Sequence, residues 1–244
     1  VLDSLEETFE TSRRANVPVV VSHHKCAGVE NWGRSVETLP VIAAAAKTQP
    51  IGVDAYPYAA GSTVLEADHV TDDIRIMVTW SKPHPEMGGR DLKDVAAGWG
   101  VTTREAALRL HPAGAIYFQM DEADVRRILA FPLTMIGSDG LPHDDHPHPR
   151  LWGTFPRVLG HYSRELALFP LETAVHKMTG LSAMRFGLHD RGFVREGYAA
   201  DLVVFDPKVV ADLATYEAPK RLSAGIETVI VNGTISYRAG STEI

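Results

Sequence analysis

Two short apolar runs that end on chemically reactive residues constrain the fold of this chain most. Residues 19–21 are followed by His23 and Lys25, and residues 134–137 are followed by Asp139. Short runs of this composition are typical of parallel strands that are covered on both faces. In a barrel of parallel strands, the carboxyl ends of the strands form the active-site face. A histidine at one strand end and an aspartate at another therefore predict a metal-assisted hydrolase.

Helical and strand-like patterns alternate through much of the chain. The hydrophobic spacing predicts helices over 2–15, 39–46, 122–131, 155–168 and 171–178, and strands over 19–22, 51–56 and 134–137. A helix–strand–helix–strand order is the signature of βα repeats. The predicted class is α/β, specifically the carboxyl-terminal part of a (β/α)8 TIM-like barrel with an insertion and part of a small β-sandwich domain.

Two regions depart from the alternation and set the expected domain boundaries. Residues 59–120 are irregular, with a capping box at Thr102 and Glu105 before one of two short helices, and read as an insertion that covers the site. From about residue 192 the pattern is β, with strands over 201–206 and 228–233 and a hairpin turn at 232–233. We therefore expect barrel βα units over 1–58, the insertion over 59–120, the last barrel unit and helices over 121–190, and part of the sandwich over 191–244.

The composition excludes several classes of protein. The chain has 24 basic and 31 acidic residues, a net charge of −7, which disfavours a nucleic-acid or anionic-membrane surface. No apolar run reaches the ~20 residues of a membrane-spanning helix. The single cysteine, Cys26, excludes an internal disulfide and fits a reducing compartment, so a cytoplasmic location is expected. Because Val1 is not a start methionine and the chain opens inside an amphipathic pattern, we expect the carboxyl-terminal part of a longer enzyme.

His23 is the first candidate metal ligand. In a strand His23 and Lys25 face the same way and His24 faces the opposite way, so one histidine of the pair looks into the site. Lys25 at the strand mouth supplies a cation beside a metal or an anion. The alternative is a strand-end histidine hydrogen-bonded to a neighbour, because one histidine does not define a zinc site that requires three or four ligands.

Asp139 and Arg150 are the candidates in the second half of the chain. Asp139 can ligate a metal or act as the base for a water molecule, and the alternative is a helix cap or an Asp-Gly turn. Arg150 has a planar fork that suits bidentate capture of a carboxylate, and the alternative is a structural salt bridge. The three histidines of the Pro-rich loop before Arg150, at 143, 146 and 148, could instead form a metal cluster of their own.

Several other noticeable residues are explained by a structural role. Cys26 is expected to be a small buried hydrophobe, and Trp80 to serve packing. The hydroxyl of Tyr56 could reach a substrate, although a packed core tyrosine is the default. The sequence holds no Gly-rich phosphate loop, no Gly-x-Ser-x-Gly elbow and no His-Glu-x-x-His motif.

Taken together, a set of motifs closely resembles the D-aminoacylases, N-acyl-D-amino-acid deacylases of the amidohydrolase superfamily. The motifs are SHHK (22–25), DAYPY (54–58), GST (61–63), GAIYF (114–118), IGSDGLPH (136–143), HPRLWGTFP (148–156), LETAVHKMTG (171–180) and ADLVVFDP (200–207). The resemblance runs from the first residues to the tail. It implies zinc-dependent hydrolysis of an N-acyl-D-amino acid to a D-amino acid and a carboxylate.

The resemblance also implies a role for each matching residue. His23 corresponds to a ligand of the tightly bound zinc, and Asp139 to the catalytic acid and base, which can approach a second, weaker metal position. Lys25, Tyr56 and Arg150 correspond to the groups that hold the substrate's α-carboxylate. Ser62 lines the same pocket.

The departures from the family pattern are equally informative. The His-x-His pair, the bridging cysteine and the other zinc-binding histidine of the family have no counterpart after Val1, and Cys26 belongs to a different motif. The chain therefore carries one of the tight zinc ligands, and by itself it is expected to be inactive. The expected partner is a small-molecule substrate with a neutral side chain, because Glu66 and Asp68 follow the pocket loop. The alternatives are a truncated inactive fragment and a Schiff-base lyase that uses Lys25 as its nucleophile.

Overall fold

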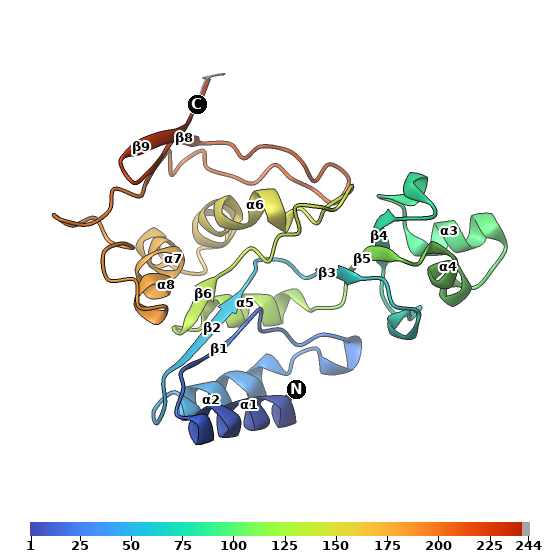
Figure 1. The fold of residues 1–244 in the computed structure, drawn as a ribbon, viewed down its shortest axis with the longest axis horizontal. Helices are drawn as coiled ribbons and strands as arrows, with labels where there is room; N and C mark the ends of the chain where they lie inside the picture. The colour runs from blue at the N-terminus through green and yellow to red at the C-terminus, as the bar shows by residue number, and fades with distance from the viewer. Residues whose placement is uncertain (241–244) are drawn as a thin grey trace.

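Three parallel strands form the sheet that positions the site. The computed structural model describes residues 1–240, and within them β1 (Val19–Val21), β2 (Ile51–Ala55) and β6 (Thr134–Ile136) pair in the order β1-β2-β6. Val19 lies opposite Ile51, and Ala55 opposite Ile136, so the three strands end at nearly the same level. Because the strands are parallel, the segments that follow them emerge on one edge of the sheet (Figure 1).

Helices cover this sheet and bury its side chains. The helices of this part are α1 (Leu2–Ala15), α2 (Ser35–Ala45), α5 (Glu122–Ala130), α6 (Arg150–Arg157), α7 (Leu171–Met178) and α8 (Gly180–Arg185), with a short 3-10 turn at Val29–Asn31. Leu5 and Phe9 of α1 pack with Ile42 of α2 against Ile51 and Val53 of β2. A second core joins Ala55 and Ile136 to α5, to the helical segment 158–165 that follows α6, and to α7. Burial of β2 and β6 explains why these two strands are almost wholly apolar, whereas the three valines of β1 are partly buried.

The segment between β2 and α5 is a separate layer with its own hydrophobic core. It contains β3 (Gly61–Val64), β4 (Ile76–Ser81), β5 (Ala113–Tyr117), α3 (Leu92–Trp99) and α4 (Thr103–Leu110), with 3-10 turns at Ala67–His69 and Pro85–Met87. The strands form an antiparallel sheet of order β3-β5-β4. Figure 1 shows this layer projecting from the parallel sheet, with α3 and α4 at its far end. The capping box predicted at Thr102 is present at the start of α4.

The last part of the chain is a small antiparallel sheet. It consists of β7 (Leu202–Phe205), β8 (Ile226–Val231) and β9 (Thr234–Arg238) in the order β7-β8-β9. The hairpin predicted at 232–233 joins β8 to β9, and Asn232 and Gly233 both have positive φ, as a tight hairpin turn requires. The final four residues of the predicted 191–244 unit lie outside the described part of the chain.

The structure confirms the α/β class and corrects several predicted elements. The helix expected over 155–168 begins at Arg150 and continues after Arg157 as a π-helix, Val158–Glu165. Pro149 precedes α6 with helical backbone angles, φ −57° and ψ −16°, and proline suits the start of a helix because its missing N–H is not needed there. The insertion contains three strands that were not predicted: β3 and β5 are short and rich in small residues, and all three are stabilised by pairing with one another. Across residues 1–240, each helix falls short of the length and apolarity that a bilayer crossing demands.

Candidate active site

A cavity of about 530 Å³ lies where the parallel strands end and the insertion begins. It is lined by all six residues that the sequence singled out, from five different segments: His23, Lys25, Tyr56, Ser62, Asp139 and Arg150. The first three follow β1 and β2, Ser62 belongs to β3, and the last two flank the loop between β6 and α6. The fold therefore brings these side chains to one place, while the role of each remains a prediction.

The turn after β1 places His23 in the cavity by a route that strand alternation did not predict. The strand ends at Val21, and His23 has a left-handed φ of 42°. Asp54 in β2 holds this turn, because its Oδ1 accepts the backbone N–H of His23 at 2.6 Å and the hydroxyl of Ser22 at 3.3 Å. His24 turns away, is buried and hydrogen-bonds to Thr38 at 2.9 Å, and burial lowers its pKa to about 4.

Asp54 is a site-building residue to which sequence reasoning gave no role. It stands in the run 51–55, whose other members are small or apolar, at a point where a carboxylate has no packing purpose. A charged residue inside a buried parallel strand was the available signal, because such a group must find hydrogen-bond donors. Here the donors are the backbone of the neighbouring turn, which carries His23.

Lys25 lies against His23 and is only partly exposed to solvent. Its ammonium nitrogen is 2.7 Å from Nδ1 of His23 and donates to the backbone oxygen of the same residue at 2.8 Å. Burial lowers the pKa of Lys25 to about 8, and the nearby Asp139 carboxylate opposes this decrease. An ammonium group can only donate, so Nδ1 of His23 has its lone pair directed at a cation.

Asp139 is held in a left-handed backbone conformation at the end of β6. Its φ is 49°, a value that aspartate tolerates better than most residues, and its Oδ2 pairs with Nη2 of Arg150 at 2.9 Å. Gly140 makes this turn possible, because a Cβ there would lie 2.6 Å from the Leu151 side chain and 3.0 Å from its Cα. His23 and Asp139 are both non-glycine residues at positive φ, a kind of strain that is concentrated at functional sites.

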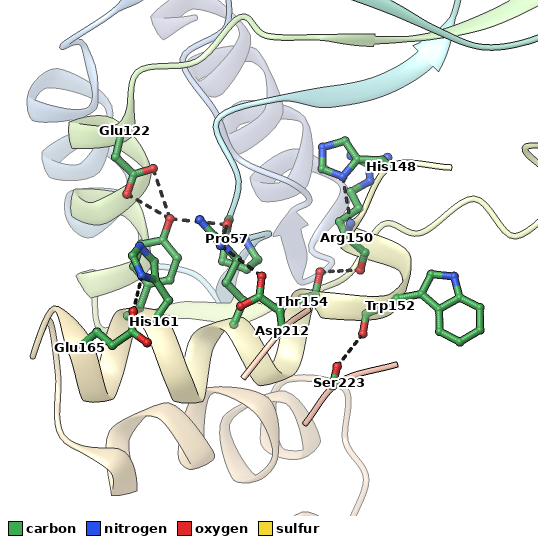
Figure 2. Close-up of polar contacts among 12 residues, drawn as sticks. Pro57, Glu122, His148, Arg150, Trp152, Thr154, His161, Glu165, Asp212 and Ser223 are labelled. Atoms are coloured by element: carbon green, nitrogen blue, oxygen red, sulfur yellow. Dashed lines mark hydrogen bonds and ion pairs between the residues drawn. The ribbon is translucent and has the colours of Figure 1, made fainter. Parts of the chain in front are cut away.

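Arg150 is the buried cation of the cavity. It is 1% exposed, stands at the start of α6 beside His148 (Figure 2), and its guanidinium lies 4.6 Å from the centre of the Tyr56 ring. Nη2 reaches Asp139 and the backbone oxygen of Ser62, whereas Nε and Nη1 have no hydrogen-bond partner among residues 1–240. A buried cation with two unused donors is costly, so this arrangement favours an anionic ligand in the cavity.

Tyr56 and Ser62 add two further polar groups without partners. Both the phenol oxygen of Tyr56 and the hydroxyl of Ser62 are buried and unbonded within the described residues. Burial raises the pKa of Tyr56 to about 12, so the phenol keeps its proton as a hydrogen-bond donor. Gly61 leaves room for the hydroxyl of Tyr56, because a Cβ at position 61 would lie 3.0 Å from the phenol oxygen.

The rest of the cavity wall was not predicted from the sequence. It includes Thr63, Val64, Trp80, Gln119, Leu141, His143 and Asp144. The assignment of Trp80 to packing alone was therefore incomplete, because the insertion sheet carries its side chain to the cavity. Asp144 is buried, burial raises its pKa, and neither carboxylate oxygen has a hydrogen-bond partner in the described residues. These residues come from loops and the insertion, where no sequence periodicity indicates which side chains meet.

The three histidines of the Pro-rich loop do not form a metal cluster. His143 is at the cavity mouth, His146 bonds to the backbone oxygen of Tyr216 at 2.6 Å, and His148 is buried. Cys26 is fully buried, as predicted for a small hydrophobe, and burial raises the pKa of its thiol.

The donor set for a metal is chemically suitable but incomplete in the described residues. His23 presents a nitrogen lone pair that a cation already contacts, and the Asp139 carboxylate lines the same cavity. Nowhere in residues 1–240 do three or more His, Cys, Asp or Glu side chains converge as a metal site requires. A tetrahedral zinc site needs at least three protein ligands, so one imidazole and one carboxylate would need further ligands.

Comparison with known proteins identifies the family. Residues 14–237 match the family described as "Amidohydrolase family". This chain belongs to the amidohydrolase family. The amidohydrolase is 62% identical over 233 residues to a D-aminoacylase of Alcaligenes xylosoxydans xylosoxydans, a match that covers 96% of this chain and 48% of the relative. It is 53% identical to an N-acyl-D-aspartate deacylase of the same organism, over 96% of this chain and 47% of that protein.

Solved structures give the same result for the fold. A D-aminoacylase crystal structure superimposes with a TM-score of 0.95 at 60% identity, covering 98% of this chain and 51% of that one. N-acyl-D-glutamate deacylase from Bordetella bronchiseptica, solved with zinc and a phosphonate inhibitor, matches with a TM-score of 0.94 at 49% identity over 98% and 50% of the two chains. The predicted resemblance to the D-aminoacylases is thus confirmed, and this amidohydrolase chain spans about half the length of the relatives it matches.

Proposed function

We propose that the protein containing this chain hydrolyses N-acyl-D-amino acids to a D-amino acid and a carboxylate. The observation that carries the proposal is the Arg150 guanidinium, which is buried at the cavity with two unused donors beside the Asp139 carboxylate. A free carboxylate next to the reacting amide is the feature that distinguishes an acyl amino acid from an ordinary amide. The names of the relatives support the same substrate class.

Arg150, Lys25 and Tyr56 form the proposed carboxylate clamp. Nε and Nη1 of Arg150 lie on different edges of the planar guanidinium, and each has a free donor for a charge-assisted hydrogen bond to a carboxylate oxygen. Lys25 and the phenol of Tyr56 lie on the same wall, with the Lys25 nitrogen 5.5 Å from the centre of the Tyr56 ring. A substrate held in this way has its amide fixed relative to Asp139, which lowers the entropic part of the barrier.

His23 is the proposed zinc ligand of this chain, completed by residues elsewhere in the whole protein. Zinc, when bound, supplies a Lewis acid that polarises the amide carbonyl and activates a water molecule. The contact between Nδ1 of His23 and the Lys25 ammonium supports this role, because the same lone pair can serve a metal cation. Asp139 lines the same cavity and is the proposed ligand of a second, weaker metal position.

Asp139 is the proposed acid and base. Its Oδ2 is engaged by Arg150, which leaves Oδ1 to accept the proton of the attacking water and return it to the leaving nitrogen. The side chain is 41% exposed and lines the cavity, so a substrate and a water molecule can reach it. Preference for the D enantiomer would follow from the position of the clamp relative to this carboxylate.

We propose that the substrate has a neutral side chain. Glu66 and Asp68, from which this preference was predicted, are not the reason for it. Asp68 is exposed and pairs with Arg104, and neither Asp68 nor Glu66 lines the cavity. Asp144 does line it, and its buried oxygens accept no hydrogen bond from the described residues, although His143 Nε2 lies 3.4 Å from Oδ1. A second acidic group near Asp144 would add repulsion in a region of low dielectric constant, whereas an apolar side chain could pack against Val64, Trp80 and Leu141.

The deciding experiment uses the complete reading frame that contains this sequence, purified with zinc. We expect hydrolysis of N-acetyl-D-methionine, little or no hydrolysis of the L enantiomer, and loss of activity on removal of zinc with a chelator. Hydrolysis of neither enantiomer by the zinc-loaded protein would refute the proposed substrate class. Equal hydrolysis of both would refute the geometry proposed for the clamp.

The lowered pKa of Lys25 is the one observation that favours the alternative, a Schiff-base lyase. An amine with a pKa near 8 is more often in the neutral, nucleophilic form than an ordinary lysine. Borohydride reduction in the presence of a carbonyl substrate should then attach the substrate to Lys25. Zinc-dependent amide hydrolysis with no borohydride-trapped adduct would eliminate this alternative.

A further inference from the structure

His148 occupies a central position behind the clamp without touching the cavity. It is 2% exposed, and both of its ring nitrogens are bonded: Nδ1 to the backbone N–H of Arg150 at 2.9 Å, and Nε2 to the backbone oxygen of Ala60 at 3.0 Å. Figure 2 shows the imidazole directly beside Arg150 at the beginning of α6. A loop residue thus connects the helix that carries the guanidinium to the segment that follows β2.

The two bonds define the protonation state of the ring. A backbone N–H can only donate, so Nδ1 must be the acceptor, and a carbonyl oxygen can only accept, so Nε2 must carry the proton. The neutral Nε2–H form satisfies both partners, whereas a doubly protonated ring would place two donors face to face at Nδ1. Burial and the nearby Arg150 charge also hold the pKa of His148 well below its ordinary value.

The segment bonded by His148 is also bonded by Arg150 itself. The imidazole holds Ala60, and Nη2 of Arg150 donates to the backbone oxygen of Ser62 at 3.2 Å. The backbone and the side chain of Arg150 are therefore both connected to residues 60–62. These contacts set the distance between the guanidinium and the wall that carries Ser62.

Aromatic rings keep the imidazole from rotating. Tyr58 lies edge-on at 5.0 Å between ring centres, and Tyr216, from the segment between β7 and β8, lies edge-on at 5.2 Å. Edge-to-face packing of this kind favours one ring orientation. The ring plane of His148, and with it the direction of both hydrogen bonds, is thereby restricted.

We propose that His148 is a positioning residue for the carboxylate clamp: as a neutral bridge between Arg150 and Ala60, it sets where the Arg150 guanidinium meets the substrate. This inference rests on the proposed function. It predicts that breaking the bridge weakens recognition of the α-carboxylate and leaves the chemistry at Asp139 largely intact.

Two substitutions separate the two ends of the bridge. In His148→Asn the side-chain oxygen can still accept the Arg150 N–H, but the link to Ala60 is lost. In His148→Gln the amide can still reach Ala60, but the acceptor for Arg150 is lost. We expect each variant to raise KM for N-acetyl-D-methionine about 3- to 10-fold, as the loss of one hydrogen bond implies, with kcat within about twofold of the parent. His148→Phe keeps the ring packing, loses both bonds and should raise KM the most.

Two controls distinguish positioning from a general structural role. With N-acetyl-D-methioninamide, which lacks the α-carboxylate, the His148 variants should retain the kcat/KM of the parent protein. In an Arg150→Lys background, His148→Gln should have little further effect on KM, because both changes act on the same contact. Equal losses on the amide substrate, additive effects with Arg150→Lys, or a fall in kcat at constant KM would each overturn the proposal.

A spectroscopic measurement tests the bridge independently of turnover. Long-range ¹H–¹⁵N spectra, with the His148 signals assigned by their absence from His148→Gln, should show a protonated Nε2 and an unprotonated Nδ1 at neutral pH. An Nδ1–H ring or an imidazolium would overturn the proposal even in an active enzyme. If the parent protein shows this tautomer but hydrolyses neither enantiomer, the proposed function fails while the bridge itself is confirmed.

Discussion

Lys177 has a buried ammonium group, and this burial makes the free energy of unfolding depend on pH. The side chain is 2% exposed, and its nitrogen donates to the backbone oxygens of Phe131 at 2.6 Å and Thr134 at 3.1 Å. Burial lowers its pKa to about 8, from 10.5 for an ordinary lysine. The neutral amine still has two hydrogens for these two carbonyls, so deprotonation removes the desolvation cost without breaking either bond.

The sign and size of the effect follow from proton linkage. Between pH 8 and 10.5 the unfolded chain binds a proton that the folded chain does not, so the free energy of unfolding increases as pH rises. The increase is about 1.4 kcal/mol per pH unit within this window, or about 2 kcal/mol from pH 7.5 to 9.5. Conversely, this contribution is lost as pH falls from the unfolded pKa to the folded pKa.

The Lys177→Met variant isolates this contribution. The free energy of unfolding is measured by urea titration for the parent protein and for the variant. We expect the parent value minus the variant value to increase by about 2 kcal/mol between pH 7.5 and 9.5. The sign of this difference at pH 7.5 alone is not diagnostic. Methionine removes a buried charge, which stabilises the variant, but it leaves two carbonyl oxygens without hydrogen-bond donors, which destabilises it. The exposed Lys82 provides a control, Lys82→Met, for the general loss of a positive charge. A difference that stays flat or decreases with pH in Lys177→Met would refute the reasoning.

Three further predictions concern the proposed site and the insertion. Asp139→Asn should lower kcat by about 10²- to 10⁴-fold with zinc content unchanged, since it removes proton transfer, and near-normal turnover would exclude that role. Arg150→Lys should raise KM about tenfold or more in steady-state assays, because an ammonium does not replace a bidentate fork, and an unchanged KM would exclude the clamp. Thr102→Ala should lower the free energy of unfolding by about 1 kcal/mol, because it removes the oxygen that accepts the Glu105 N–H at the start of α4; no change in a urea titration would contradict this.

The sequence alone was sufficient for the parallel strands and for the residues at their ends. Apolar runs between helical patterns located β1, β2 and β6 within one residue or two, because strands buried on both faces leave a continuous hydrophobic signal. His23, Tyr56 and Asp139 were then identifiable, since each follows such a strand directly. Lys25 and Arg150 were candidates because of their cationic groups, and the family resemblance added Ser62; all three line the same cavity.

The antiparallel sheet of the insertion was beyond the reach of sequence patterns. Residues 61–64 and 113–117 are small or mixed in polarity, and they become strands because each supplies the hydrogen-bond partners of the other. Strand preference of this kind depends on the neighbouring strand more than on the residues themselves. For the same reason the cavity residues that the insertion contributes, such as Trp80 and Thr63, could not be foreseen.

The local sequence thus determined which residues end the parallel strands, because periodicity and composition record burial along the chain. The tertiary structure decided what those residues contact. Asp54 holds the turn that presents His23, and His148 joins Arg150 to a segment 88 residues away, and neither pairing leaves a trace in the spacing of residues. Long-range hydrogen bonds form only after the chain has been brought together by burial, so the geometry of the site is a property of the fold.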